Sequence, residues 1–189
     1  GGALYVEEGA NVSIVYSNGS TVFSGNNAEG GNAGSINKMS DYHGNAQNGE
    51  GIGDAIFLKD DLTLDVQNDA QVIIRDNIGG YAGATQNADA YQDSNKGGII
   101  KNGSGTLVLD IADDSASSYS GNTTINEGKM IVASENALSQ YSDLVVNNGT
   151  IQLNADQSVE NLYSETVDSE SNDSDSEGSV NLNGKNLTV

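Results

Sequence analysis

A glycine-led pattern, G-x-Φ-x-Φ with Φ an apolar residue, recurs four times in the C-terminal half of the chain. Its copies begin at Gly105, Gly128, Gly149 and Gly178, at intervals of 23, 21 and 29 residues. Recurrence near this length is typical of solenoids, in which each repeat is one coil stacked on the last. Within each copy apolar and polar residues alternate, as in a strand with one buried face. We assign the corner before each strand to glycine, which tolerates a positive φ angle.

The composition favours one solenoid domain. The 189 residues include 24 Gly and 24 Asn but no Pro, Cys or Trp, and Gly and Asn make tight turns at little steric cost. Only 35% of the residues are hydrophobic, which is low for a compact globule but sufficient for a narrow core under each coil. Regular strand patterns argue against disorder, the alternative for so polar a chain. We therefore predict a single all-β domain over residues 1–189.

The charge excludes several classes of partner. Seven basic residues against 27 acidic ones give a formal charge of −20, which makes nucleic acid and anionic lipid poor partners. The absence of cysteine excludes a disulfide framework and thiolate zinc sites. No apolar run approaches the roughly 20 residues of a membrane helix. Because the chain opens on Gly-Gly-Ala-Leu and stops in a strand-like segment, we expect it to be an internal piece of a longer protein.

A longer repeat is present in the first half of the chain. One copy comprises residues 1–4 (GGAL), 12–16 and 21–26, and a degenerate second copy comprises residues 53–56, 62–66 and 72–77. The closing asparagine lies 25 residues after the first glycine in one copy and 24 in the other. We predict two further sets of coils, so residues 1–98 form a loop-rich part and residues 99–189 a regular part.

Three polar insertions interrupt the coils, at residues 27–52, 78–98 and 167–177. Loops of such length are usually functional or disordered, and loops mounted on a scaffold often carry binding residues. The acidic third insertion accounts for the longest glycine interval. The first two insertions contain the predicted partner-binding residues Met39, Tyr42, His43, Tyr81 and Tyr91.

The residues from Ile99 to Val132 resemble the autotransporter-associated β-strand repeat of bacterial type V secretion passengers. The segments that carry this resemblance are IIKNGSGTLVL (99–109) and YSGNTTINEGKMIV (119–132), and the ending GSVNLNGKNLTV (178–189) is similar to the family's later coils. The GGAL and FSGN segments of the first half resemble the short motifs of chlamydial-type polymorphic outer-membrane proteins. The second copy departs from that pattern at Asp54 and Ile74.

The resemblance implies a right-handed parallel β-helix, displayed outside the cell after export through a C-terminal outer-membrane barrel. The chain itself shows no such barrel, so any membrane attachment would depend on a part of the protein outside this sequence. The family is also associated with folding during export and with self-association between passengers. We expect an extracellular or cell-surface location, anchored at the outer membrane or released.

Catalysis and metal binding are weakly supported by the sequence. His43 is the only histidine, and the chain lacks a nucleophile signature that would complete a Ser-His-Asp triad. An enzyme acting on acidic polysaccharides would draw on Asp60, Asp61, Asp65 and Asp69, but Asp65 falls on an outward strand position where a solvated charge is the default. The acidic run 168–177 offers oxygen ligands for calcium without the spacing of known calcium loops. We expect no catalytic residue, cofactor or metal site.

The function we expect is that of an adhesin or host-interaction surface without catalysis. Its partner would be a host cell-surface receptor, a matrix protein or a second passenger. Three alternatives remain open: a stalk and folding nucleus with the function upstream, a secreted ligand of a host receptor, and an acidic-polysaccharide enzyme.

Overall fold

The structure is a computed structural model that describes residues 2–32, 48–83, 96–112, 116–164 and 178–189. In these residues the regular elements are β-strands, apart from one 3-10 turn, η1 (Tyr81–Gly83). Every strand pair in them is parallel. The all-β class and the parallel pairing predicted from the sequence are confirmed.

Two six-stranded sheets and one three-stranded sheet contain most of the strands. The β2 sheet contains β2 (Val12–Tyr16), β5 (Leu62–Val66), β8 (Ile99–Asn102), β10 (Thr123–Ile125), β12 (Leu144–Val146) and β15 (Leu162–Tyr163). The β3 sheet contains β3 (Ser20–Phe23), β6 (Gln71–Ile74), β9 (Thr106–Leu109), β11 (Lys129–Val132), β13 (Thr150–Leu153) and β16 (Ser179–Asn181). The β1 sheet contains β1 (Leu4–Val6), β4 (Ile56–Leu58) and β7 (Ile78–Gly79), and β14 (Gln157–Ser158) pairs with β17 (Leu187–Thr188).

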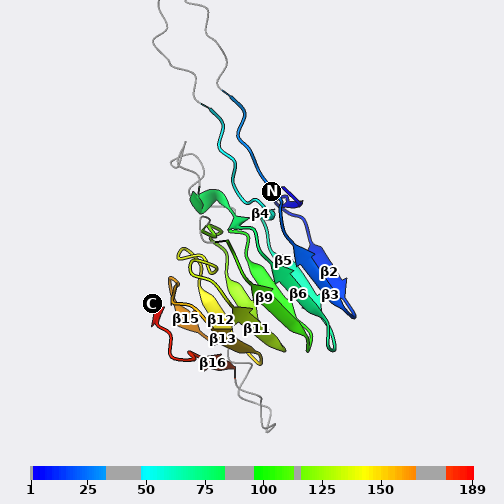
Figure 1. Ribbon diagram of the computed structural model, residues 1–189, viewed down its shortest axis with the longest axis vertical. Helices are drawn as coiled ribbons and strands as arrows, with labels where there is room; N and C mark the ends of the chain where they lie inside the picture. Colours follow the sequence, from blue (N-terminus) through cyan, green and yellow to red (C-terminus); the bar gives the residue numbers. More distant parts are fainter. Residues whose placement is uncertain (1, 33–47, 84–95, 113–115, 165–177) are drawn as a thin grey trace, which may run out of the picture.

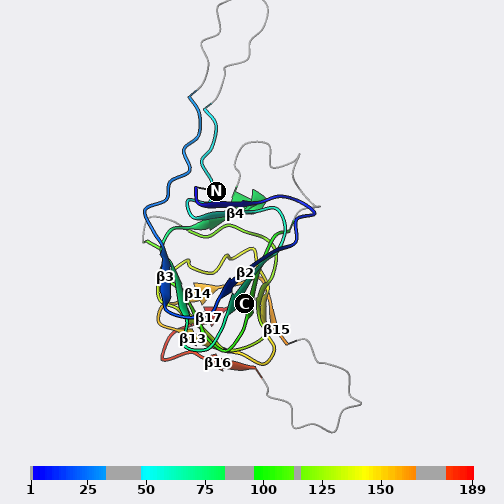
Figure 2. The same cartoon turned by 90° about the vertical axis from the view of Figure 1, so that its right-hand side faces the viewer.

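The chain visits these sheets in turn, so each strand pairs with the equivalent strand of the next turn. Figure 1 shows the strands following one another in chain order, from β2 and β3 at the right (blue) to β15 and β16 at the lower left (orange to red). Figure 2, rotated by 90°, shows β3, β15 and β4 on different sides of a common interior. This arrangement is compatible with the predicted β-solenoid.

The predicted repeats lie in register with one another. The first apolar residues after the four glycines of the pattern lie side by side on adjacent strands of the β3 sheet. Leu107 pairs with Met130, Met130 with Ile151 and Ile151 with Val180. The alignment of the two copies in the first half is also confirmed, because Leu4 pairs with Ile56. The second copy's departure from Phe to Ile falls at one position of the stack, since Phe23 pairs with Ile74.

A single hydrophobic core fills the space between the sheets. Alternation places every second residue inward, as in β5, where Leu62, Leu64 and Val66 are fully buried while Thr63 and Asp65 face outward. Aliphatic side chains from all three of the larger sheets join this core. Burial of apolar area contributes about 25 cal/mol per Å², so continued stacking stabilises each turn through its neighbours.

The glycine that opens each repeat is required mainly for space rather than for a positive φ angle. Among the four glycines only Gly128 has a positive φ, of 67°. At Gly105 a Cβ atom would lie 2.6 Å from the carbonyl oxygen of Ala70, and at Gly178 it would lie 2.2 Å from that of Val146. Our assignment of the corner to positive φ is therefore wrong at three positions. At Gly105 and Gly178 the backbone of the preceding turn leaves no room for a side chain, and at Gly149 the side chain of Ile125 would lie 2.3 Å from a Cβ atom.

Two of the predicted insertions are partly structured where they are described. The second insertion was predicted to begin at residue 78, but Ile78 and Gly79 form β7 and pair with Ile56 and Phe57 of β4. In the first insertion, residues 27–32 and 48–52 run beside each other away from the sheets (Figure 1), with the amide of Gly49 donating to the carbonyl of Gly31. The third insertion, residues 167–177, lies outside the described residues.

Polar side chains join successive turns at the C-terminal ends of strands β8, β10 and β12. Asn126 donates to the side-chain oxygen of Asn102 at 2.9 Å and accepts from the amide of Asn147 at 2.8 Å. The members of this amide ladder are half-buried and lie outside the hydrophobic core. Inside the core, the hydroxyl of the fully buried Tyr119 lies 2.7 Å from Oγ1 of Thr123.

Candidate functional site

An aromatic cluster lies on the β1 sheet. Tyr5 and Phe57 occupy paired positions of β1 and β4, and their rings stack with centroids 5.4 Å apart and an interplanar angle of 7°. Tyr81, in η1, meets Phe57 edge-on at 5.4 Å. Phe57 is almost buried, whereas Tyr5 is 49% exposed. The aromatic cluster therefore combines a packed centre with an exposed ring.

A charged pair borders the aromatic cluster. Lys59 forms a salt bridge with Glu7, and its ammonium lies 6.0 Å from the centroid of the Tyr81 ring, within the range of a cation–π contact. The hydrogen bond between Lys59 and Glu7 raises the pKa of the lysine and lowers the pKa of the glutamate. Partial burial raises the pKa of Tyr5, with a smaller contribution from its hydrogen bond to Glu7. Both charges are thus held in place beside the rings.

Of the five predicted partner-binding residues, Tyr81 alone belongs to the described part of the chain. The other four, Met39, Tyr42, His43 and Tyr91, lie outside the described residues. Tyr81 was predicted as a loop residue that acts with these four. The structure instead brings it together with Tyr5 and Phe57, which the sequence analysis did not select.

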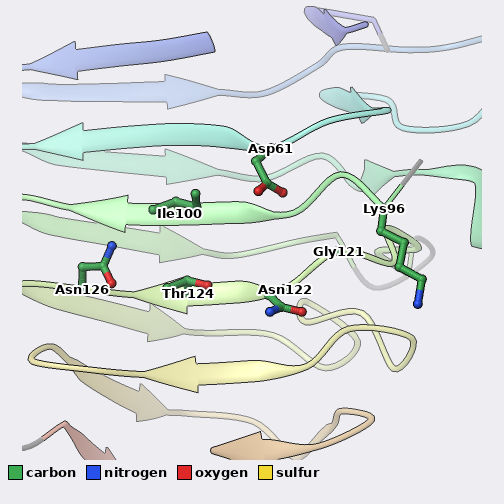
Figure 3. A pocket seen from close by; sticks show the side chains of 7 residues that line it. All are labelled: Asp61, Lys96, Ile100, Gly121, Asn122, Thr124 and Asn126. Carbon is green, nitrogen blue, oxygen red and sulfur yellow. The ribbon is translucent and has the colours of Figure 1, made fainter. Parts of the chain in front are cut away.

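A polar groove of about 400 Å³ crosses the outer face of the β2 sheet (Figure 3). It is lined by Asp61, Lys96, Ile100, Gly121, Asn122, Thr124 and Asn126. Ile100 and Thr124 are paired neighbours on β8 and β10 and form its floor. Figure 3 shows Asp61 and Asn122 on either side of β8, with Lys96 at one end.

Hydrogen bonds fix the side chains that line the polar groove. Asp61 is exposed and accepts from the backbone amide of Gly98 at 2.8 Å through one of its carboxylate oxygens. The side-chain amide of Asn122 donates to the hydroxyl of Tyr163 at 3.0 Å. Tyr163 itself is 39% exposed. The polar groove thus presents a carboxylate, an amide oxygen, a hydroxyl and an ammonium at its surface.

Three of the four carboxylates considered for polysaccharide chemistry accept hydrogen bonds from nearby groups of the chain, and the fourth is exposed in a turn. Asp60 accepts from the backbone amides of Gly9 and Asp61, both at 2.8 Å, and Asp61 caps Gly98 as described above. Asp65 faces outward, as predicted, and accepts from the side chain of Gln67 at 3.0 Å. Asp69 is exposed in the turn before β6. Among the described residues no three carboxylate or imidazole groups gather closely enough to hold a metal ion.

Lys101 is a fully buried cation that the sequence analysis did not single out. Its ammonium donates to the backbone carbonyls of Asn102, Gly103 and Glu127 at 2.8, 2.6 and 3.2 Å. Burial lowers its pKa to about 8, against smaller opposing effects of Asp65 and Glu127. Because Glu127 belongs to the next turn of chain, Lys101 links two successive turns.

The sequence contains a signal for part of these sites. Tyr5 and Phe57 each follow directly after a copy of the GGAL motif, so aligning the copies would have paired the two rings. The polar groove gives no comparable signal, because its walls come from residues 61, 96 and 122 and depend on the pairing of β5, β8 and β10.

Comparisons with known proteins place one part of the chain. No curated protein and no solved structure gives a significant match to the sequence. No helix among the described residues is long and apolar enough to cross a membrane. Residues 99–132, which span β8 to β11, match the family model of the passenger-associated-transport-repeat. This segment, the one whose sequence resembled autotransporter strand repeats, is therefore supported as an autotransporter passenger repeat.

Proposed function

We propose that the chain is a segment of an autotransporter passenger that forms a right-handed parallel β-helix outside the cell. The family match over residues 99–132 carries this proposal. Further support comes from the pairing around that match. β8 and β9 pair in register with β5 and β6 of the preceding turn, and β10 and β11 pair with β12 and β13 of the following turn. The matched repeat is thus continuous with turns on both sides of it.

The passenger segment acts as an adhesin or host-interaction surface and performs no catalysis. Two exposed side-chain surfaces on the stacked strands support this function: the aromatic cluster and the polar groove. Aromatic side chains are enriched at binding surfaces because they offer large contact area at low entropic cost. The partner is a receptor or matrix molecule of a host cell.

Binding to cultured cells tests this function. Fluorescently labelled chain is titrated onto epithelial and endothelial cells, and an unrelated acidic protein of similar size serves as the reference. We expect saturable binding that weakens when residues 33–47 and 84–95 are both replaced by short linkers, or when Tyr81→Ala removes one ring. Thr150→Ala, on the outer face of the β3 sheet, is the matched control. Binding no greater than the reference would contradict the adhesin function.

A second candidate function is that of a stalk and folding nucleus. The matched family is described by its association with passenger transport, and parallel turns that bury their apolar faces against neighbours can fold one after another. In the full passenger, deletion of residues 99–189 would then abolish export. A passenger exported normally after this deletion would exclude the stalk function.

A further inference from the structure

We propose that the polar groove on the β2 sheet binds a neutral oligosaccharide. This inference deepens the proposed function and rests on it, because it names the class of host molecule that the passenger segment contacts. The groove lies in the middle of the stack, and its walls come from turns that are paired on both sides. Its volume of about 400 Å³ falls within the range of about 300–1,000 Å³ found for small-ligand sites.

The floor of the polar groove excludes a ligand that binds by adding a strand. The backbone groups of β8 and β10 are engaged with neighbouring strands, for example through the amide of Ile99, which donates to Asn122 at 2.9 Å. A peptide that recognises sheet edges needs free backbone donors and acceptors. Recognition in the groove must therefore depend on side chains.

The side chains of the polar groove match the chemistry of sugar hydroxyls. A hydroxyl both donates and accepts hydrogen bonds, and the groove offers both kinds of partner. Asp61 keeps one oxygen outside its bond to Gly98, and Asn122 uses its amide nitrogen on Tyr163 while its oxygen has no partner among the described residues. Thr124 supplies a hydroxyl beside the apolar side chain of Ile100.

The exposed ring of Tyr163 lies beside the groove, two strands away from Thr124, with the buried Val145 between them. Thr124, Val145 and Tyr163 occupy the same position on three successive strands, and strands lie about 4.8 Å apart. This spacing is close to the length of one hexose unit in an extended glycan. The hydrogen bond from Asn122 holds the Tyr163 ring near the groove, where the apolar face of a sugar can pack on it.

Charge selects among glycans. The chain carries a formal charge of −20, which repels polyanionic sugars before contact. Among the side chains that line the groove, Lys96 supplies one positive charge and Asp61 one negative charge. A neutral chain of hexose or N-acetylhexosamine units fits this balance better than a sialylated or sulfated one.

Glycan arrays and calorimetric titration test the inference on the intact chain. We expect binding to neutral oligosaccharides, weakened about tenfold or more by Asn122→Ala or Tyr163→Ala, since each removes a contact group. Thr150→Val, a half-exposed threonine on the β3 sheet, should bind as the unmodified chain does. Circular dichroism confirms that each variant is folded. Tyr163→Leu, which removes the aromatic ring but keeps an apolar side chain, serves if Tyr163→Ala does not fold.

Three results would overturn the carbohydrate inference: no neutral glycan bound, equal binding by the groove variants, or preference for sialylated or sulfated glycans. Binding to cells whose surface sugars have been oxidised with periodate distinguishes a failure of the carbohydrate inference from a failure of the proposed adhesin function. Saturable binding that survives oxidation rejects the carbohydrate ligand but leaves the adhesin function intact. Glycan binding without any binding to cells supports the groove assignment and rejects the adhesin function.

Discussion

Leu64 and Lys101 occupy the same position on the paired strands β5 and β8, and both side chains are fully buried. An apolar residue returns at this position in β10, where Ile125 pairs with Lys101. One turn of the stack therefore places an ammonium where its neighbours place aliphatic carbon. Its three bonds to backbone carbonyls compensate for part of the lost hydration.

The first prediction concerns Lys101 and pH. Burial sets its pKa in the folded chain near 8, below the 10.5 of an exposed lysine. Below pH 8 the side chain of Lys101 is charged in both the folded and the unfolded chain, so folding bears the full cost of burying the ammonium. Between these two values only the unfolded chain holds the proton, so the contribution of Lys101 to the free energy of unfolding rises with pH.

Lys101→Met isolates this effect. The difference in the free energy of unfolding between the unmodified chain and the variant should shift in favour of the unmodified chain by up to about 3 kcal/mol from neutral pH to about pH 10.5. Urea denaturation at several pH values measures it, and tyrosine titration cancels in the difference. A difference that stays constant across this range would contradict the buried position of the ammonium.

A second prediction concerns the space at Gly105. A Cβ atom there would lie 2.6 and 2.8 Å from the carbonyl oxygens of Ala70 and Val66. Gly105→Ala should therefore destabilise the chain by about 1–3 kcal/mol through overpacking. The matched control is Gly31→Ala, because nothing lies within 4 Å of a Cβ atom at Gly31 and its φ is not positive. Equal unfolding midpoints for the two variants would argue against close backbone packing.

The third prediction concerns the amide ladder. Asn126→Ala removes hydrogen bonds to both Asn102 and Asn147, at a net cost of about 0.5–1.5 kcal/mol for each bond. Asn148→Ala is the control, because this neighbouring side chain is exposed and contributes only its backbone to the pairing. Chemical denaturation of both variants measures the cost. The ladder would be irrelevant to stability if the two variants unfolded alike.

The sequence predicts those parts of the fold that depend on periodicity. The glycine-led repeats and the two copies of the first half lie in register, as Leu107 with Met130 and Leu4 with Ile56 show. Strand β12 carries no such signal, because all three of its residues are buried and alternation is lost. β7 was assigned to a loop since it is only two residues long.

The candidate site was less accessible to sequence analysis. Tyr81 was selected as a loop residue, but its contact with Phe57 depends on the pairing of β4 with β7. The polar groove joins Asp61, Lys96 and Asn122 across three turns, and no local pattern relates residues so far apart. Lys101 resembles any surface lysine in sequence, and only its register with Leu64 places it inside.

The most direct test of the account is the location of the chain on the cell that produces it. Antibodies raised against the purified chain are applied to intact and to permeabilised bacteria that express the full-length protein. We expect equal labelling of both samples, together with loss of the signal from intact cells after external protease treatment. Labelling that requires permeabilisation would contradict an extracellular passenger and, with it, a function in contact with host cells.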